Sequence, residues 1–495
     1  MQTPKDAVYL NEQIQLCEQY ALQHLQLSVD ELMAQAGAAS FSTLCKEFPH
    51  VKNIVIFCGS GNNAGDGLVL AKLAHQHGYV VTVNLLKEIE VLSDEARHAA
   101  LQAIASGVTC LFGDDLLDHN ENLLADADLL IDAIIGIGLY DNIREPYATV
   151  INQINYSNIP VMAIDIPSGL NSDTGKIMGY CIRAAITVTF IGKKFGMMTA
   201  DGVDVCGRII LHTLNLSEYL GAPAAMLLSN TMKNYRLPRR LANCYKNQFG
   251  HILIIGGNIG MPGSVCLAAE AALRVGAGLV TIVTQSCYAG YATLRLPEAM
   301  IFGIENAIEI QCLLEQATVC LIGTGLGTDD WAQQLFNIVI ASHLPMVIDA
   351  SALQILAVHP QYDDNWVLTP HPGEAAHLLA CSITVIQNDR YLAVQRLQQQ
   401  YGGTIVLKGV GSLICHDSIA LCDAGNPGMA SPGMGDVLSG VIAGLIAQGL
   451  SLAQATNFGV YIHSKAADLA AEEFGQRGLL ATDLFQYLRQ LVNAV

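Results

Sequence analysis

Two glycine-rich stretches carry the residues of this sequence that are best placed to do chemistry. The first, CGSGNNAGDGLVLAKLAHQHG, runs from Cys58 to Gly78 and reads as a strand, a Gly/Asn-rich turn and an amphipathic helix. Backbone N–H groups in such a turn converge beside a helix N-terminus, so the stretch predicts an anion-binding site, although glycines there can also serve only to make a tight turn. The second runs from Asn426 to Gly449 and contains SPGMGD before a long apolar run.

In the second stretch, Asp436 falls in the first turn of a predicted helix, beside Gly433 and Gly435. The exposed N–H groups and the helix dipole would stabilise a phosphoryl oxyanion, and the Asp436 carboxylate would lie next to it as a base. The alternative is an acid that only stabilises the first turn, worth about 1 kcal/mol. We favour the catalytic role because so many glycines precede the apolar helix.

Two further predicted strands end in carboxyl-bearing residues. Asp132 stands in IDAIIGIGL, and Asp165 and Ser168 stand in IDIPSGLNSDTG. An acid at a strand end often serves only as a helix cap or loop contact, but open α/β sheets bind ligands at this carboxyl edge. Together with Asn63, these side chains supply oxygen ligands without cysteine or histidine. Such a set suits a monovalent or alkaline-earth cation better than a transition metal.

The first stretch lies within an alternation of apolar and amphipathic segments. Strand-like runs at 53–58, 80–86, 129–136, 161–166 and 186–192 are bounded by Gly, Pro, Asn or Asp, with helix-like segments such as Leu68–His77 between several of them. Two helical stretches, near Val8–Tyr20 and Val29–Glu47, precede the series. This alternation predicts a mostly parallel, doubly wound α/β sheet.

The alternation lapses between Leu214 and Lys246, which predicts a boundary near residue 225 and two domains, 1–225 and 226–495. A second α/β series then has strand-like runs at 251–257, 279–284, 318–323, 345–350, 404–409, 412–416 and 418–423. The last three runs are closely spaced and suggest hairpins at one edge of a sheet. Long helices follow from Gly433 and from about Leu452. The two halves differ in pattern, so we expect two different α/β domains.

Composition argues against several classes of function. The 495 residues are 52% hydrophobic and 14% charged, which is typical of large α/β cores. A formal net charge of −19 argues against nucleic-acid and anionic membrane partners. The 14 cysteines form no C-x-x-C pair, which indicates a reducing compartment. The N-terminus lacks an apolar signal core, and the most apolar stretch, Val437–Leu450, is too short and Gly-rich to span a bilayer. We therefore expect a cytoplasmic protein with no membrane partner.

The first half resembles the YjeF N-terminal family of NAD(P)H-hydrate epimerases over roughly residues 8–215. The similarity is carried by ELMAQAG (31–37), GNNAGDG, DAIIGIGL and DIPSGL. It implies a Rossmann-like doubly wound domain with a substrate cleft formed by Asn62, Asn63, Ala64, Gly65, Asp66, Gly136, Ile137, Gly138, Leu139, Tyr140, Asp141, Asn142 and Asp165. It also implies a potassium ion held by Asn63, Asp132 and Ser168.

Two residues depart from that family's pattern. Ala64 and Gly65 stand where Gly-Gly is usual, and Ile137 stands where Thr is frequent, which removes a hydroxyl contact at that point. Inverting the hydroxyl-bearing carbon needs a group that assists the departure and return of the hydroxyl, or ring opening and closure. Asp165 or Asp132 could be that acid/base. If Asp132 holds the ion, Asp165 is the better candidate.

The second half resembles the ribokinase-like dehydratases of hydrated NAD(P)H from about residue 243 onward. The matching pieces include IGTGLGTDD, VIDASAL, LTPHPGEAAHLL, VLKGVGSLI and GNPGMASPGMGDVLSGVIAGL, in family order. Asn247-Gln248 and SPGMGD depart from the usual pattern. The resemblance implies that Ser264, Gly327, His371 and Asp436 face the hydrated nicotinamide nucleotide, with Asp436 as the catalytic base. It also implies that Lys408, Gly409, Val410, Gly411, Ser412 and Gly435 hold ADP, used with Mg²⁺.

The sequence therefore predicts a bifunctional repair enzyme whose substrates are hydrated NADH and NADPH (NADHX and NADPHX), acting as a homo-oligomer. One alternative is a metabolic kinase of the ribokinase fold, which the GMGD motif alone does not exclude but the attached first half and TPHPGE do in large part. The other is a first half that only binds nucleotides and has lost catalysis. The presence of Asn63, Asp132, Asp165 and Ser168 argues against such a loss.

Overall fold

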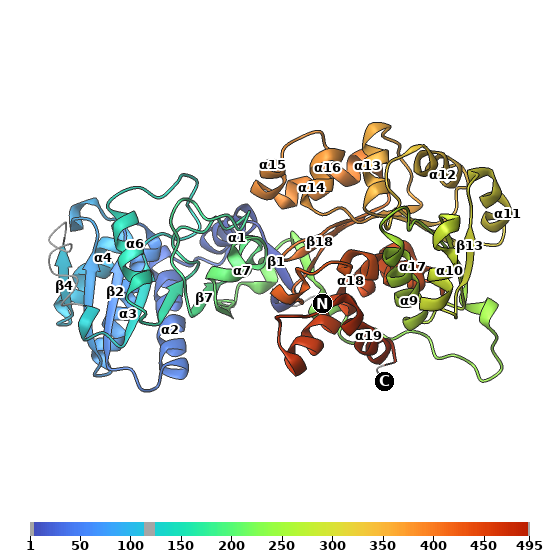
Figure 1. Cartoon of the computed structure of the whole chain (residues 1–495). Coiled ribbons are helices and arrows are strands. Elements are labelled where there is room, and N and C mark those ends of the chain that lie inside the picture. The colour runs from blue at the N-terminus through green and yellow to red at the C-terminus, as the bar shows by residue number, and fades with distance from the viewer. Residues whose placement is uncertain (1–3, 113–123, 494–495) are drawn as a thin grey trace. The chain divides into compact units, whose positions relative to one another are not determined.

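The structure is a computed structural model that describes residues 4–112 and 124–493. The chain divides into two compact units, Met1–Ala225 and Met226–Val495, here called the first and second units. Each is an α/β unit with a largely parallel sheet (Figure 1). Among the described residues, no helix is long and apolar enough to cross a membrane.

The first unit is built on a parallel sheet. Its strands follow the spatial order β4 (Thr109–Phe112), β3 (Val80–Leu85), β2 (Asn53–Cys58), β5 (Leu129–Ala133), β6 (Val161–Ile164), β7 (Ile186–Phe190) and β9 (Arg208–His212). The helices are α1 (Asn11–His24), α2 (Val29–Glu47), α3 (Asn62–Gln76), α4 (Asp94–Ala105), α6 (Tyr147–Tyr156) and α7 (Gly202–Val205). Two short strands, β1 (Ala7–Tyr9) and β8 (Lys193–Lys194), form a separate parallel pairing.

Helices cover both faces of this sheet, which explains why its strands read as nearly continuous apolar runs. On β2, Ile56 and Cys58 point toward α3. A Cβ built on Gly67 of α3 would lie 3.3 Å from the Cys58 sulfur. Val55 and Phe57 alternate onto the other face and join the core cluster that contains Ile151 of α6. The predicted doubly wound α/β fold is confirmed.

The strand order reverses between β2 and β5, which is where open α/β sheets form a ligand crevice. The chain runs from β2 outward to β3 and β4, then returns to place β5 on the other side of β2. The loops that follow the two central strands therefore diverge. Asn62 comes just after one of these strands, and Gly136 just after the other.

The second unit has a longer sheet with mixed strand directions. The order is β13 (Met300–Gly303), β12 (Leu279–Thr284), β11 (His251–Ile255), β14 (Val319–Ile322), β15 (Met346–Ile348), β16 (Trp366–Leu368), β17 (Thr404–Leu407), β18 (Ser412–Cys415), β19 (Ile419–Cys422) and β10 (Ala225–Leu227). Only the β17–β18 and β18–β19 pairings are antiparallel among these described strands. Here the order reverses between β11 and β14.

Helices again cover the two faces of the second sheet. They are α8 (Leu228–Thr231), α9 (Pro262–Arg274), α10 (Ser286–Arg295), α11 (Gln311–Leu314), α12 (Asp330–Ile340), α13 (Ser351–Val358), α14 (Pro372–Leu378), α15 (Ile383–Asn388), α16 (Arg390–Tyr401), α17 (Met434–Ala447), α18 (Leu452–Phe474) and α19 (Leu484–Val492). Helices α9, α17 and α18 lie on one side of the sheet and α12, α13 and α14 on the other (Figure 1). Close approach of α17 to α9 requires glycine, since a Cβ at Gly440 would lie 2.1 Å from the Ala268 carbonyl oxygen.

Three local predictions were wrong. The stretch Asn62–Gly67 is already helical, because α3 begins at Asn62, six residues before the predicted start. Residues 7–9 form β1, so the first helix begins at Asn11 and not near Val8. The antiparallel strands β17, β18 and β19 are present, but they are not at the edge, because β10 pairs with β19.

Candidate active sites in the two units

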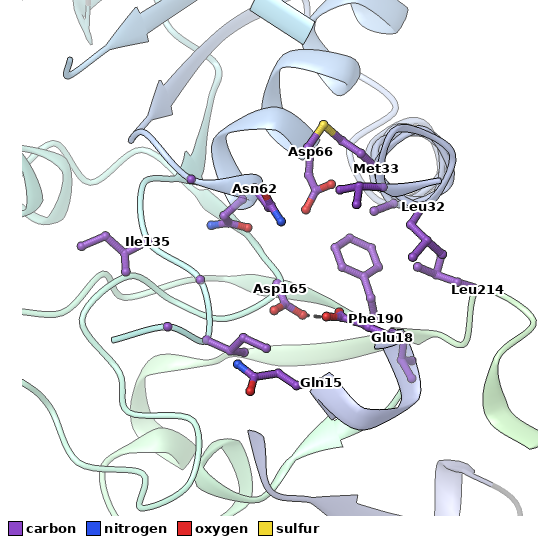
Figure 2. Close-up of a pocket in the computed structure, with 18 of the residues that line it drawn as sticks. Gln15, Glu18, Leu32, Met33, Asn62, Asp66, Ile135, Asp165, Phe190 and Leu214 are labelled. Atoms are coloured by element: carbon purple, nitrogen blue, oxygen red, sulfur yellow. Dashed lines mark hydrogen bonds between the residues drawn. The ribbon is translucent and has the colours of Figure 1, made fainter. Parts of the chain in front are cut away.

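A cavity of about 550 Å³ opens at the crevice of the first unit, between the N-terminus of α3 and the loop after β5. Its described lining includes the predicted residues Asn62, Asn63, Asp66, Gly136, Ile137, Gly138 and Asp165. Apolar walls come from Leu32 and Met33 of α2 and from Phe190, as Figure 2 shows. The cavity therefore combines an apolar wall with convergent polar groups, as binding sites for small molecules do.

Asp165 is held at the cavity wall by a buried lysine. It follows β6 with φ of +66°, a left-handed conformation that side chains other than glycine and asparagine rarely adopt. Its Oδ1 atom pairs with the ammonium group of Lys194, whose side chain is 1% exposed. The same ammonium donates to Thr189 Oγ1 at 2.9 Å and to the Phe190 carbonyl oxygen at 3.1 Å. All three donors of Lys194 are thus used, and the Asp165 carboxylate is fixed.

Two other carboxyl groups share this cavity. Asp66 extends from the first turns of α3, and Glu18 extends from α1 (Figure 2). Burial raises the pKa of Asp66 well above its usual range, and Asp165 and Glu18 raise it further against the opposing effect of Lys194. Burial and then Asp165 raise the pKa of Glu18 to about 6. Although Asp66 is partly exposed, its exposed surface faces the cavity.

Asp132 and Ser168 lie beneath the cavity floor, fully buried. Ser168 donates to the Asp132 carboxylate from its backbone N at 2.7 Å and from its Oγ at 2.5 Å. Burial raises the pKa of Asp132 to about 6, although the hydrogen bonds from Ser168 oppose this. Ser168 Oγ also lies 3.1 Å from the Ile135 carbonyl oxygen, so these two side chains anchor the loop after β5.

Asn63 is the one member of the predicted cation set whose polar atoms have no protein partner. Both its side-chain oxygen and nitrogen are buried without a hydrogen bond, and the residue is only 8% exposed. Its amide lies against the Gly136 loop, since a Cβ at Gly136 would lie 3.8 Å from Asn63 Oδ1. A buried amide oxygen rarely remains unpaired, so the structure offers an oxygen ligand that fits a cation.

The remaining predicted residues of the first unit are not among the residues that line the cavity. Ala64 and Gly65 face the core, where Gly65 packs against Met33. Residues Leu139, Tyr140, Asp141 and Asn142 continue the loop beyond the cavity, and Tyr140 is 70% exposed. The Tyr140 hydroxyl accepts a hydrogen bond from the Asn11 side-chain amide nitrogen at 3.1 Å.

In the second unit, Asp436 lies in the first turn of α17, after Gly433, which has φ of +86°. Burial raises the pKa of Asp436 to about 6, and Asp349 contributes in the same direction. A hydrogen bond with Ser264 and the ammonium group of Lys408 oppose that rise. Ser264, near the start of α9, and Asp436 are therefore brought together as predicted residues of one site.

Lys408 lies near three carboxyl groups, those of Asp349, Glu374 and Asp436. Its Nζ atom is 3.0 Å from Asp349 Oδ1 and 3.8 Å from Glu374 Oε2. A Cβ at Gly435 would lie 3.4 Å from the same Nζ, so the N-terminus of α17 approaches the ammonium group closely. Burial alone would lower the pKa of Lys408, but Asp349 and Glu374 outweigh it and raise that pKa. Ser439 donates to the other oxygen of Asp349 at 2.8 Å.

His371 and Gly327 sit at the same carboxyl edge of the sheet. His371 is the N-cap of α14, and its Nδ1 accepts from the Gly373 backbone at 2.9 Å. Its Nε2 lies 3.5 Å from Glu374 Oε1, which links the imidazole to the Lys408 group. Gly327, with φ of +76°, follows β14 and packs against the Asn258 amide.

The loop Lys408–Ser412 is held by a buried arginine. Arg390, which is 2% exposed, donates to the carbonyl oxygens of Leu407, Lys408 and Gly411, each at 3.3 Å. Gly409, with φ of +138°, and Gly411, with φ of +64°, let the backbone wrap around the guanidinium group. Ser412 Oγ closes the turn onto the Gly409 carbonyl oxygen at 2.9 Å, while Val410 is 56% exposed.

Sequence reasoning missed four residues of these sites: Glu18, Lys194, Asp349 and Arg390. Asp349 carried a signal, because it ends the strand-like run PMVIDA just as Asp165 ends VMAIDI. For Lys194 and Arg390 the sequence carried only a weak signal, because each is a basic residue beside apolar segments in a chain with few charges. Nothing in the helical pattern around Glu18 distinguishes it from the solvent-facing acids of α1.

Comparison with known proteins matches a different family to each half of the chain. A family described as NAD(P)H-hydrate dehydratase matches residues 252–490, and a family described as YjeF-related protein N-terminus matches residues 29–196. The bifunctional NAD(P)H-hydrate repair enzyme of Coxiella burnetii is 45% identical over 493 residues, which cover 98% of this chain and 99% of the relative. The enzyme of the same description from Escherichia coli is 38% identical, covering 98% and 94%.

Among solved structures, a ribokinase-like superfamily protein from Enterococcus faecalis matches with a TM-score of 0.51 and 33% identity. The match covers 55% of this chain and 97% of that protein. A single ribokinase-like unit therefore accounts for about the share of the chain that the second unit occupies.

Proposed function

The chain belongs to the family of bifunctional NAD(P)H-hydrate repair enzymes, and we propose that its two units divide the repair of hydrated NADH and NADPH. The first unit interconverts the R and S epimers. The second unit dehydrates the S epimer to NAD(P)H, with ADP converted to AMP and phosphate. The observation that carries this assignment is the presence of a separate acid/base site in each unit, Asp165 with Lys194 and Asp436 with Lys408.

In the first unit, the substrate cleft is the cavity between α3 and the loop after β5. Hydrated nicotinamide carries a hydroxyl on the carbon next to an enamine nitrogen. Asp165 assists the departure or return of that hydroxyl because its carboxylate lies at the cavity wall in a fixed orientation. The apolar surface of Leu32, Met33 and Phe190 suits the flat ring.

Potassium is the cation we propose for the first unit, held by Asn63, Asp132 and Ser168. The unpaired Asn63 oxygen supports this choice, as does the close pairing of the other two residues. Within residues 4–112 and 124–493, no three His, Cys, Asp or Glu side chains are grouped so that they could hold a metal ion. Such an oxygen set suits a weakly coordinated monovalent ion. When bound, it would orient substrate oxygens and stabilise negative charge.

In the second unit, Asp436 takes the proton of the substrate hydroxyl. The oxygen then attacks the terminal phosphorus of ADP, and the resulting phosphate is a far better leaving group than hydroxide. Loss of phosphate, pushed by the enamine nitrogen, leaves an iminium ion. Loss of a proton from the neighbouring ring carbon to the departing phosphate then restores the dihydropyridine. Lys408 and the N-terminus of α17, including Gly435, lie where they would stabilise the phosphoryl oxygens. Mg²⁺, held mainly by the nucleotide phosphates, would neutralise charge on them.

Substrate contacts in the second unit are assigned to Ser264, Gly327, His371 and Asp436, and nucleotide contacts to the loop Lys408–Ser412 and to Gly435. Ser264 is joined to the base directly, and His371 through Glu374 and Lys408. We further propose a cytoplasmic location, since all 14 cysteines are free thiols, and a homo-oligomeric state.

One assay tests the proposed function. The purified chain is given mixed epimers of hydrated NADH with ADP, Mg²⁺ and K⁺, and recovery of the reduced-nicotinamide absorbance is followed. We expect complete recovery with ADP and none without it. Recovery of only the S fraction would contradict the epimerase assignment, and no recovery at all would contradict the dehydratase assignment.

A further inference from the structure

Three carboxyl groups in the cavity of the first unit share one ammonium group. Glu18, Asp66 and Asp165 line the cavity, and Lys194 is the one cationic side chain among the described residues that line it. Figure 2 shows Asp66 and Asp165 pointing into the cavity from opposite sides, with the Phe190 ring beside the gap. Both carboxyl-bearing residues therefore line the space in which a ring would lie.

The ammonium group of Lys194 is committed to Asp165. It donates to the Asp165 carboxylate, to Thr189 Oγ1 and to the Phe190 carbonyl oxygen. A lysine has three N–H donors, so none is left for the other two acids. Among the described residues, the side-chain carboxyl groups of Asp66 and Glu18 have no hydrogen bond and no ion pair in this structure.

Asp66 is left without a share of the Lys194 ammonium donors, and this affects its protonation. Asp66 is surrounded by Glu18 from α1, by Asp165 from the loop after β6 and by Lys194 from β8, and burial is the largest influence on it. Burial and the two acids raise the pKa of Asp66 well above its ordinary value. Such an environment favours the protonated form of the Asp66 carboxyl group. The pKa of Glu18 rises to about 6, because burial and Asp165 raise it and Lys194 opposes them.

We propose that Asp66 is the proton donor of the epimerisation and Asp165 its proton acceptor, with Lys194 as the positioning residue that holds Asp165 as an ionised base. This inference rests on the proposed function of the first unit. It assigns opposite roles to two carboxyl groups on opposite sides of one cavity, as acid/base pairs in other enzymes take their roles from their environments.

The proton transfers balance over one inversion. Asp66 gives its proton to the substrate hydroxyl, the C–O bond breaks with its electron pair on oxygen, and water leaves while the enamine nitrogen forms a double bond to carbon. Water then adds to the opposite face of that carbon, and Asp165 takes the proton that the water loses. A proton passes from Asp165 back to Asp66 to restore the starting state, and the reverse inversion follows the same steps backward.

The test uses the full chain with Asp66→Asn, Lys194→Met and Lys194→Arg. Asp94→Asn serves as the matched control, because the Asp94 side chain is 87% exposed on α4, away from the cavity lining. Epimerisation is measured by chromatographic separation of the R and S forms across the pH range. ADP-driven dehydration of the pure S form by the second unit reports the concentration of folded enzyme in every variant.

We expect Asp66→Asn to lower the epimerisation rate about 10²–10⁴-fold at neutral pH with normal dehydration. The wild-type rate should decline at alkaline pH as Asp66 loses its proton, and the residual rate of Asp66→Asn should lack that decline, since an amide does not titrate. Lys194→Met should lower the epimerisation rate with normal dehydration, because the Asp165 carboxylate loses the ammonium group that holds it in place. Lys194→Arg should restore most of the wild-type profile.

An Asp66→Asn variant that keeps the wild-type rate or its alkaline decline would overturn the proposal. So would a Lys194→Met variant that keeps the wild-type epimerisation rate. If Lys194→Met does not fold, as judged by lost dehydration, the nearly isosteric Asp66→Asn still decides the matter. Failure of the wild-type chain to interconvert the epimers would instead overturn the proposed function itself.

Discussion

Each site sets one ammonium group against several carboxyl groups. Lys194 pairs with Asp165 while Asp66 and Glu18 lie nearby, and Lys408 pairs with Asp349 near Glu374 and Asp436. An unpaired buried charge is costly, so the surplus carboxyl groups hold protons at higher pH than they would in water. Burial raises the pKa of Glu18 and that of Asp436 to about 6, near the range in which proton transfer is efficient.

Replacing Asp436 by asparagine distinguishes a catalytic role of this residue from a role in stabilising helix α17. If Asp436 only stabilises the first turn of α17, its loss should cost on the order of 1 kcal/mol of stability and little activity. If it is the base, dehydration should fall roughly 10²–10⁴-fold, while ADP binding and epimerisation persist. Near-normal dehydration by Asp436→Asn at saturating ADP and substrate would place the base elsewhere.

The pH dependence of dehydration gives a second readout on Asp436. Burial raises the pKa of this carboxyl to about 6. A base must be ionised, so the wild-type rate should hold above that pKa and fall as the pH drops through it, by about tenfold per pH unit below. Dehydration measured from about pH 4.5 to about pH 8 checks this. A rate that stays level across this range would contradict the assignment.

The cation proposal is best tested at Asn63. Its amide has no hydrogen bond to the protein, so Asn63→Ala breaks no side-chain hydrogen bond within the described chain. We expect nearly unchanged thermal stability and a rise of at least about tenfold in the K⁺ concentration that half-saturates epimerisation, since an oxygen ligand is lost. Asp132→Asn is less clean because Asp132 also anchors Ser168 and the loop after β5. Epimerisation that needs no monovalent cation would contradict the proposal.

At the scale of helices and strands, the sequence predicted most of the elements that frame the sites. Strands β2, β5, β6 and β17 and helix α17 lie where apolar runs and glycines placed them. Short or weakly apolar strands such as β13 and β16 were missed, because Met300–Gly303 and Trp366–Leu368 are too brief to show a period. Their pairing with distant strands, and not their own pattern, stabilises them.

The start of α3 shows why local reasoning mistook the glycines of the first motif. None of Gly59, Gly61, Gly65 and Gly67 has a positive φ, so they do not make a left-handed turn. Gly59, Gly65 and Gly67 allow close packing instead, since a Cβ at Gly59, for example, would lie 2.0 Å from the Ile134 carbonyl oxygen. Such a requirement depends on a strand about 70 residues later in the chain, and no local pattern reveals it.

Candidate site residues divide in the same way. Asp165 could be named from the sequence because it follows a parallel strand, and chemistry gathers at the carboxyl edge of such strands. Asp436 could be named because it follows glycines at the start of a helix. Lys194 and Arg390 could not, because their role is to hold another residue or loop, and that role exists only in the folded chain. The predicted family and fold are confirmed, while the roles of individual residues stay predictions.

Two glycines of α3 give a matched pair of predictions. A Cβ at Gly67 would lie 2.5 Å from Ala133 Cβ, in the rigid contact between α3 and β5. At Gly65 it would lie 2.3 Å from the terminal methyl group of Met33, which can move. Overpacking a rigid contact costs about 1–3 kcal/mol, and alanine returns up to about 1 kcal/mol through helix propensity.

Gly67→Ala should therefore lower the melting temperature of the first unit. Gly65→Ala should melt close to the wild type but raise the KM of epimerisation, because Met33 lines the cavity. Thermal unfolding and epimerisation kinetics of the two variants check this. Equal loss of stability in both would show that Met33 cannot move as its flexible side chain suggests.

Over the whole molecule, each unit has its own core and its own site. The largest core cluster of the second unit runs from Leu228 to Leu488 and joins α9, α17, α18 and α19 to the sheet. The cavity of the first unit and the Lys194 group that serves it lie entirely within residues 15–214. Separate cores and separate sites predict that the two reactions can be separated physically.

The last prediction concerns a fragment of residues 221–495. It keeps β10, whose backbone pairs with β19, and Ser229, whose backbone N donates to Asp423 at 2.9 Å. A fragment that begins at residue 230 loses both contacts and should melt at a lower temperature. We expect the longer fragment to fold and to convert the S epimer with ADP and Mg²⁺, leaving the R epimer to its slow spontaneous inversion. The full chain with Asp165→Asn is the matched control, because it keeps the first unit but lacks the proposed base, and it should show the same preference. Equal turnover of both epimers by the fragment would mean that epimerisation does not need the first unit.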